Sequence, residues 1–499
     1  MQAYASEPVD GAFAASCIRF DSMVDWLAGE QTAGMSHAEL EDRLHADGLA
    51  LLRQLLQDSL DLRAEREVRI DAVVDADGYR RGWAEPARQR VLTTRFGQVV
   101  VARIAYRARG RSDLHPADAV LNLPAEKHSH GLRRLVALEA ARGSFDDAAA
   151  ATERATGVRL GKRQVEALAA AAAADVDGFY AVHAPAPASD TDVLVMTFDG
   201  KGVVMRPDGL RAATAKAAAS QKLATRLSKG EKRNRKRMAE VAAVYDLTPA
   251  PRTADDVLPN DGERTAAVAG PRAAGKWLTA SVTDDAAAVI AAGFDEADRR
   301  DPGHQRSWVA LVDGNTHQID RIRAEARARN VTVRIVVDFI HVLEYVWKAA
   351  WCFHAEGDPK AEQWVRAHAR QILAGRAGVA AAAIRRKATY HGLDPGQRKN
   401  ADTTAGYLLS KKPYLDYPTA LTAGWPIATG VIEGACRHLV KDRMDITGAR
   451  WGLPGAEAIL KLRALTSNGD FDQYWTWHLT QEQQRLHNSR YLDAVIPIE

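Results

Sequence analysis

The sequence predicts a multidomain protein of the α plus α/β class, in which helical regions accompany an α/β core. The chain has 499 residues, which is more than one hydrophobic core accommodates. Helical periodicity and one hairpin pattern occupy its first part, and a linker rich in proline and alanine follows at residues 183–190. After that linker, short apolar runs alternate with helical segments, which is typical of an α/β domain.

The composition argues against several classes of protein. The apolar fraction of 46% is ordinary for a globular chain, and no stretch of about 20 uncharged apolar residues could span a membrane. The N-terminus lacks the basic start and apolar core of a signal peptide. The three cysteines, Cys17, Cys352 and Cys436, have no paired spacing, so we expect neither disulfides nor a cysteine zinc site. These features predict a cytoplasmic protein without a membrane partner.

The N-terminal part of the chain contains one long helix and one hairpin. In the predicted N-terminal helical region, residues 1–75, Ser36 can cap a helix whose leucines recur on one face. This helix either packs on its own chain or serves as a dimer helix. In the β-hairpin region, residues 76–125, the pattern of residues 91–107 alternates on both sides of a turn at Gly97.

A helix-turn-helix is predicted within residues 126–182. Helices at residues 132–142 and 145–156 precede a turn at Gly157, and a third helix occupies residues 161–174. The third helix begins with side chains that can reach base edges, which makes this the predicted DNA-binding region: Lys162, Arg163 and Gln164. Helix pairs joined by glycine turns are common, so ordinary helical packing is the alternative interpretation.

Residues 190–341 and 425–470 form the predicted α/β core, with a mixed sheet. Its apolar runs and helices recur along the chain: strands at 193–198, 203–206, 239–247, 308–312 and 332–337, and helices near 284–298, 316–329, 431–442 and 453–466. An α-helical insertion, residues 342–424, interrupts this core. A C-terminal tail with several aromatic residues, 471–499, completes the chain.

Three carboxylates occupy comparable settings in the core. Asp199 and Asp313 each end an apolar run, and Glu433 lies in a late helix. If folding brings them to one edge of the sheet, they offer the hard oxygen ligands that Mg²⁺ prefers. Two such ions about 4 Å apart activate a nucleophile and stabilise the leaving oxygen in phosphodiester chemistry. The triad therefore indicates metal-dependent phosphate chemistry, whereas any one of these acids alone would more often be a loop or cap residue.

Two further candidates follow the last apolar run of the core. Asp338 ends that run and is an alternative to Asp313 as the second metal ligand, although the Gly-Asn context favours Asp313. His341 lies three residues further on, so both side chains can face the same edge. A neutral imidazole there can hydrogen-bond a metal ligand or contact a phosphate. The alternative is that His341 is a buried structural partner of Asp338.

The order Asp199, Asp313, Glu433 resembles the ribonuclease H-like catalytic domain of DDE transposases. In that family the acids lie on the first strand, after the fourth strand and on a late helix. The spacing of Asp338 and His341 resembles the Asp-X-X-His signature of Mutator-like and hAT-like transposases. The resemblance implies that the triad binds two Mg²⁺ ions, with Mn²⁺ as a substitute, and that Asp338 and His341 support the catalytic site.

Residues 432–452 resemble the glutamate region of the bacterial Kra-type insertion-sequence family, and the wider resemblance covers most of residues 130–470. It implies a DNA transposase that binds the ends of an insertion sequence, cleaves a strand and transfers it to target DNA. The expected partners are terminal inverted repeats and target DNA, bound by a homodimer or higher oligomer at the bacterial nucleoid. The alternatives are a catalytically inactive, transposase-derived DNA-binding regulator and a structure-selective nuclease on the same fold.

Basic residues cluster in two places that such an enzyme could use. A run with a single acid, either a phosphate-binding arm or a solvated face, includes Lys232, Arg233, Arg235 and Lys236. Near the glutamate, five residues are candidates for DNA contact: Arg437, Lys441, Arg443, Arg450 and Trp451. Arg437 can instead form an internal ion pair with Glu433, and Trp451 either stacks on a base or is buried in the core.

Overall fold

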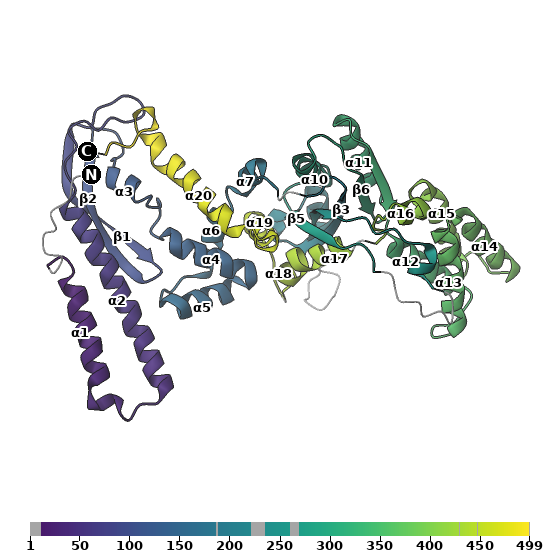
Figure 1. The fold of residues 1–499 in the computed structure, drawn as a ribbon, viewed down its shortest axis with the longest axis horizontal. Coiled ribbons are helices and arrows are strands. Elements are labelled where there is room, and N and C mark those ends of the chain that lie inside the picture. Colours follow the sequence, from purple (N-terminus) through teal and green to yellow (C-terminus); the bar gives the residue numbers. More distant parts are fainter. Residues whose placement is uncertain are drawn as a thin grey trace. The chain divides into compact units, whose positions relative to one another are not determined.

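The computed structural model of the chain describes residues 11–185, 188–220, 235–259, 269–428, 430–446 and 448–498. By its internal contacts the chain divides into two compact units (Figure 1). The first unit comprises Met1–Ala181 together with Gly469–Glu499, and the second unit is Val182–Asn468. The two ends of the chain therefore contribute to the same unit, and the α/β core with its insertion forms the other.

The first unit begins with two helices, α1 (Ala14–Ala28) and α2 (His37–Glu65), joined by the short 3-10 helix η1 (Glu30–Thr32). Ser36 caps α2 as predicted, because its side chain accepts a hydrogen bond from the amide of Glu39 and the Glu39 carboxylate binds the Ser36 amide. The predicted hairpin is also confirmed, as antiparallel β1 (Trp83–Thr94) and β2 (Gly97–Arg107).

Five helices follow the hairpin: α3 (Pro116–Val120), α4 (His130–Arg142), α5 (Phe145–Thr156), α6 (Lys162–Ala172) and α7 (Val176–Val182). Gly157 ends α5 in the left-handed conformation, with φ of 68°, which a residue with a side chain rarely adopts. The turn therefore redirects the chain from α5 into α6, and the two helices have the predicted sequence positions.

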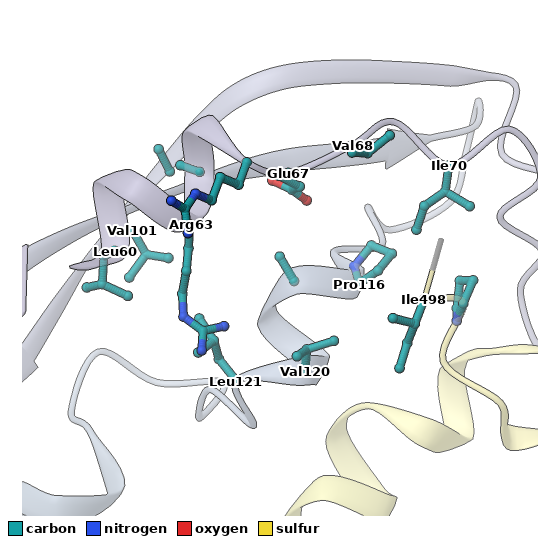
Figure 2. A pocket seen from close by; sticks show the side chains of 15 residues that line it. Leu60, Arg63, Glu67, Val68, Ile70, Val101, Pro116, Val120, Leu121 and Ile498 are labelled. Atoms are coloured by element: carbon teal, nitrogen blue, oxygen red, sulfur yellow. The ribbon is translucent and has the colours of Figure 1, made fainter. Parts of the chain in front are cut away.

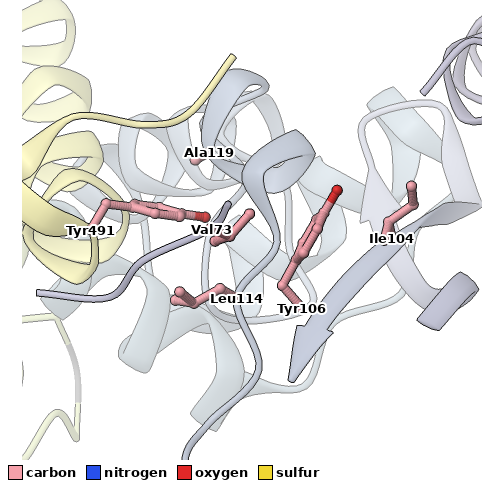
Figure 3. Close-up of a cluster of buried hydrophobic side chains, with 6 residues drawn as sticks. All are labelled: Val73, Ile104, Tyr106, Leu114, Ala119 and Tyr491. Carbon is pink, nitrogen blue, oxygen red and sulfur yellow. The ribbon is translucent and has the colours of Figure 1, made fainter. Parts of the chain in front are cut away.

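The segment that we expected to be a tail is an ordered part of the first unit. It contains α20 (Phe471–Leu486) and the 3-10 helices η6 (Asn488–Arg490) and η7 (Leu492–Ala494). Tyr491 packs in a buried cluster with apolar residues from the hairpin region, shown in Figure 3 and formed by Val73, Ile104, Tyr106, Leu114 and Ala119. Local sequence patterns could not predict this contact, because the partners of Tyr491 lie several hundred residues earlier in the chain.

The second unit is built on a five-stranded mixed sheet with the strand order β5-β4-β3-β6-β7. The strands are β3 (Val193–Val204), β4 (Lys236–Leu247), β5 (Ala273–Ser281), β6 (Trp308–Val312) and β7 (Val333–Val337). β4 runs antiparallel to both β3 and β5, whereas β6 runs parallel to β3 and β7 runs parallel to β6. The carboxyl ends of β3, β6 and β7 therefore point to the same edge of the sheet.

The structure corrects two predictions about these strands. The runs at 193–198 and 203–206 belong to one continuous strand, β3, because β4 pairs along its whole length. β5 was not predicted, since Gly275 and Lys276 interrupt its apolar pattern, and it forms by pairing with β4. The βαβ unit of β6, α11 (Thr316–Ala328) and β7 is confirmed.

Helices cover the sheet and form the predicted insertion. Between β3 and β6 lie η2 (Pro207–Gly209), α8 (Ala212–Ser220), α9 (Ala254–Val257) and α10 (Ala286–Arg300). The insertion contains α12 (Phe339–Ala350), α13 (Pro359–Leu373), α14 (Ala377–Tyr390), α15 (Lys399–Ser410), η4 (Lys412–Tyr414) and α16 (Tyr417–Thr422). After it come α17 (Gly430–Ala435), the π-helix η5 (Cys436–Lys441), α18 (Asp442–Met444) and α19 (Leu453–Asn468). Among the described helices, none has the length and apolar content needed to cross a bilayer.

Candidate functional site

Three predicted acids lie on or directly after parallel strands of the second unit's sheet, Asp199 within β3 and the other two after β6 and β7. β3 pairs with β6 only as far as Thr197, so the exposed Asp199 lies just beyond the point where β6 ends. Asp313 directly follows β6 and Asp338 directly follows β7. Because these three strands run parallel, their acids reach the same edge, which is where α/β sheets place ligands.

One cavity of about 130 Å³ is lined by all five predicted catalytic residues of the core. Its lining includes Asp199 from within β3, Asp313 and Asp338 from the ends of β6 and β7, His341 from α12 and Glu433 from α17. The other lining residues were not predicted to belong to the site: Thr197, Phe198, Leu311, Val312, Ile340, Glu344 and Ile432. Residues separated by more than a hundred positions in sequence therefore share a single concave site.

Two acidic groups close to Asp199, Cys436 and Glu240, have raised pKa values. One oxygen of its carboxylate accepts a hydrogen bond from the Gly200 amide at 2.7 Å, and the other accepts one from the Cys436 thiol at 3.3 Å. Burial raises the pKa of Cys436, and the charge of Asp199 adds to this rise, so the thiol stays protonated and donates. Burial also raises the pKa of Glu240, which lies opposite Gly200 on β4, and Asp199 contributes again.

Glu433 is exposed and lies at the end of a short helix that widens into a π-helix. The predicted helix 431–442 is therefore not regular, because the turn at Cys436–Lys441 contains an extra residue. Single π-turns within α-helices frequently occur at functional sites. The widened turn also separates Glu433 from Arg437, whose guanidinium lies 3.8 Å from the Asp442 carboxylate instead. The internal Glu433–Arg437 ion pair that we considered as an alternative does not form.

Asp313 and Asp338 differ in exposure and in the hydrogen bonds that their carboxylates accept. Asp338 is only 4% exposed and caps α12, accepting hydrogen bonds from the amides of Ile340 at 2.6 Å and His341 at 3.4 Å. Asp313 is exposed, and one of its oxygens accepts from the Asn315 amide at 2.7 Å. The capping role makes Asp338 part of the framework, and it leaves Asp313 as the more available ligand.

His341 is a partly exposed member of the cavity. Its side chain is 36% exposed, and Nδ1 lies 3.8 Å from the Glu344 carboxylate. The link to Asp338 runs through the His341 backbone amide, whereas the ring packs edge-on against Tyr345 and Tyr407. The imidazole is therefore not the buried partner of Asp338 that we considered as an alternative, and it is accessible to a ligand.

The donor set of the cavity fits a hard divalent cation. Its carboxylates offer oxygen ligands, and the Thr197 hydroxyl beside them is fully buried without a hydrogen-bond partner in the described part of the chain. The acids do not enclose a single ion: among the described residues, only Asp175, His478 and Glu482 place three ligand atoms within 4.8 Å of one another. Mg²⁺ suits the looser arrangement, because it usually retains several waters and binds only one or two carboxylates directly.

The group formed by Asp175, His478 and Glu482 belongs to the first unit and could hold a metal ion of unknown identity. The sequence analysis missed it, although His478 and Glu482 lie four residues apart on one helix, a spacing that places them on one face. His478 Nδ1 lies 2.6 Å from Asp175, and Arg133 and Arg485 also bind these carboxylates. Two arginines thus already neutralise the two acids.

The three predicted recognition residues of α6 differ in whether their side chains have partners within the protein. Lys162 forms an exposed ion pair with Asp146 at 2.5 Å, and the Gln164 side chain accepts a hydrogen bond from the Gly161 amide. Arg163 is exposed, and among the described residues it has no hydrogen-bond or ion-pair partner. In the basic run, Lys232 and Arg233 lie outside the described residues, while Arg235 and the exposed Lys236 lead into β4.

Two of the side chains predicted to contact DNA are buried in the structure. Trp451 is 4% exposed, its indole N–H donates to the Met444 carbonyl at 3.0 Å, and its backbone pairs with Val204 and Arg206. Arg443 is 2% exposed and stacks over the Trp451 ring, 4.7 Å from its centroid. The backbone of Trp451 therefore joins this segment to the end of β3, and neither side chain is exposed for DNA contact. Lys441, Arg437 and Arg450 remain exposed.

A second, larger cavity lies in the first unit. It has a volume of about 290 Å³ and is lined mainly by apolar side chains, with Arg63 and Glu67 among them (Figure 2). None of the predicted site residues contributes to this cavity, whose charged lining residues are Arg63, Arg66 and Glu67. We therefore place the candidate functional site at the carboxylate cavity of the second unit.

Comparison with known proteins does not assign the chain. No protein-family model matches it, and no curated protein matches its sequence. The functional argument therefore depends on the geometry of the site.

Proposed function

We propose that this protein is a DDE-type DNA transposase that cleaves and joins DNA strands with the help of divalent metal ions. One observation carries the proposal: Asp199, Asp313 and Glu433, which are far apart in sequence, line one cavity at the edge of the sheet. Clustered carboxylates are the recurrent device of two-metal phosphoryl transfer. An enzyme of this kind needs no covalent nucleophile of its own, only rigid placement of its ligands.

The order of the secondary structure supports a ribonuclease H-like core. Within the second unit, Asp199 belongs to the first strand, β3, and Asp313 follows the fourth strand, β6. Glu433 lies on a helix after the insertion. These positions are the ones that the resemblance to DDE transposases implies. The mixed sheet and the α-helical insertion are compatible with the same architecture.

In the proposed mechanism the chain supplies ligands and orientation. Asp199, Asp313 and Glu433 would hold two Mg²⁺ ions, for which Mn²⁺ can substitute, while Asp338 keeps α12 in place through its amide contacts. The bound ions would supply charge neutralisation at the phosphate and a more acidic water. His341, exposed at the rim, is placed to contact a phosphate oxygen or a water near the acids.

Exposed basic side chains supply the proposed contacts to DNA. Arg163, on the first turn of α6, is available for base or phosphate contact. In the second unit, Lys441 and Arg450 are exposed near the segment that carries Glu433. Such contacts contribute salt-sensitive affinity that does not depend on sequence. Because both ends of an element must be cut and joined, we propose that the protein acts on DNA as a dimer or higher oligomer.

The test uses the full-length protein and a DNA fragment carrying the genomic sequences that flank its gene, where short inverted repeats are expected. With Mg²⁺, we expect metal-dependent nicks at the repeat ends and joined products with a second DNA. Asp199→Asn and Glu433→Gln should abolish both products while leaving DNA binding intact. Glu362→Gln, an exposed acid of α13 outside the cavity, is the matched control that should retain both activities.

The alternatives predict different products. A structure-selective nuclease on the same fold would nick DNA in Mg²⁺ without joining it. A DNA-binding regulator would bind the repeats, and Glu433→Gln would leave its biological output unchanged. Metal-dependent joining would exclude both alternatives. The absence of any cleavage with intact repeats and Mg²⁺ would reject the proposal.

A further inference from the structure

The helical insertion reaches the acidic edge of the sheet through two tyrosine hydroxyls. Tyr407, on α15, donates a hydrogen bond to the backbone carbonyl of Asp313 at 2.9 Å. Tyr417, on α16, donates one to the carbonyl of Val337 at 2.8 Å, and Val337 immediately precedes Asp338. Each hydroxyl therefore binds the backbone at the carboxyl end of a parallel strand, at or next to an acid of the cavity.

Tyr407 is held in place by its neighbours on the insertion. Its ring stacks on Tyr345 of α12, with centroids 4.0 Å apart and planes inclined by 10°. The Thr404 hydroxyl, one turn earlier on α15, donates to the Tyr345 backbone carbonyl at 2.7 Å. The Lys348 ammonium lies 4.8 Å from the Tyr345 ring centroid. The hydroxyl of Tyr407 is thus presented by a packed element.

The loop after β6 is shaped to accept this hydroxyl. Gly314 adopts φ of 93°, and a Cβ at this position would lie 2.7 Å from the Tyr407 hydroxyl oxygen. Only glycine combines this backbone conformation with so close an approach. A second contact comes from Lys411, whose ammonium donates to the Thr316 hydroxyl at 2.7 Å. The insertion therefore binds the loop on both sides of Asn315.

We propose that the insertion positions the acids of the cavity, with Tyr407 and Tyr417 as positioning residues for Asp313 and Asp338. The consequence for catalysis rests on the proposed function, whereas the positioning itself does not. The Asp313 carboxylate accepts from the Asn315 amide, so the conformation of this turn sets the direction of the carboxylate. Small displacements of a ligand weaken a site that depends on pre-organised geometry.

The test compares Tyr407→Phe and Tyr417→Phe with Tyr474→Phe in the full-length protein. Tyr474 is the matched control, because it is buried in the first unit and its hydroxyl also donates to a backbone carbonyl, that of Ala172, at 2.6 Å. The first measurement is hydrogen–deuterium exchange of the backbone amides at 314–316. We expect exchange there to accelerate roughly 3- to 10-fold in Tyr407→Phe, as one lost hydrogen bond implies, and to stay unchanged in Tyr474→Phe.

The second measurement is Mn²⁺ binding, followed by electron paramagnetic resonance of the free ion. The Mn²⁺ binding that is present in the wild-type protein and lost in Asp199→Asn is assigned to the cavity. We expect both insertion variants to weaken this share roughly 3- to 10-fold, and the control variant to leave it unchanged.

The two measurements separate the two proposals. Wild-type protein without any Asp199-dependent Mn²⁺ binding would count against the proposed function, and the exchange data would still decide the positioning role. Unchanged exchange at 314–316 in Tyr407→Phe would overturn the positioning role, even if the enzyme cleaves DNA. An equal loss of Mn²⁺ affinity in Tyr474→Phe would also overturn it, because the effect would then reflect general destabilisation.

Discussion

Each of the two units contains a group of acids. Arginines bind the acids of the first unit, whereas those of the second unit have no ion-pair partner among the described residues. In the first unit, Asp175 and Glu482 are bound by Arg485, and Glu482 also binds Arg133 at 2.9 Å. In the second unit, Asp199, Asp313 and Glu433 form no ion pair with any residue that the structure describes. The first group is a neutral internal network, whereas the second keeps its negative charge available.

This difference bears on which carboxylates are available to bind a cation. Burial alone would raise the pKa of Asp175, but hydrogen bonds from Arg485 and His478 outweigh burial and lower it. A carboxylate held in this way is already paired, and a cation would have to displace an arginine. Asp199, Asp313 and Glu433 have no ion-pair partner among the described residues. Proximity of ligand atoms selects the group in the first unit, although arginines already bind its two carboxylates.

The largest expected effect concerns the cavity. Asp199→Asn should reduce metal-dependent strand cleavage at least about a thousandfold, because it removes a charged ligand from a two-metal site. The same change should alter the free energy of unfolding by no more than about 0.5 kcal/mol, since the side chain is exposed. Gel-based nicking assays and denaturant unfolding measure the two quantities. A large loss of stability would show that this acid, too, is structural.

The next effect concerns the network of the first unit. Arg133→Met should lower the free energy of unfolding by about 3 kcal/mol, because it leaves the Glu482 carboxylate, 9% exposed, without one of its two cations. Denaturant titration measures this change. A chelator should leave the wild-type unfolding curve unchanged. If the chelator destabilised the protein as much as the substitution does, the group would be a metal site and the contrast between the units would fail.

The third effect is a dependence of stability on pH in the same region. Burial, together with the charge of Arg133, lowers the pKa of His130 to about 4. Between pH 6.5 and 4 the unfolded chain therefore binds a proton that the folded chain does not, so stability falls as the pH falls. The loss should be on the order of 2 to 3 kcal/mol across this window. His130→Gln should flatten this part of the curve, and an unchanged slope would contradict the assignment.

The smallest expected effect compares two neighbouring cations in the helix-turn-helix. Arg163→Ala should weaken DNA binding several-fold and reduce the salt dependence by about one counterion. Lys162→Ala should have a smaller effect, because Lys162 already pairs with Asp146 at 2.5 Å. Fluorescence anisotropy at several salt concentrations measures both. Equal effects would show that the ion pair of Lys162 with Asp146 does not persist in solution. No effect of either substitution would argue that α6 is an ordinary packed helix.

Local sequence patterns determined most of the elements. The Ser36 cap, the glycine turns at Gly97 and Gly157 and the buried run of β6 depend on neighbouring residues, and each was predicted at or near its observed position. The candidate acids were visible for the same reason, since a charged residue that ends an apolar run is conspicuous in sequence. β5 was missed because its stability comes from pairing with β4 rather than from its own pattern.

Only the tertiary structure decided which of these residues meet and what each side chain is free to do. It buried Trp451 and Arg443, joined α20 to the first unit and placed Tyr407 against Asp313. Such contacts depend on side chains that lie tens to hundreds of residues apart, and no local periodicity encodes them. The sequence by itself determined most helices and strands and the acidic character of the candidate site, because short-range propensity and the hydrophobic pattern are enough to identify them. Tertiary packing decided which charged side chains are paired and which side chains are buried, because both depend on partners that the chain brings together only when it folds.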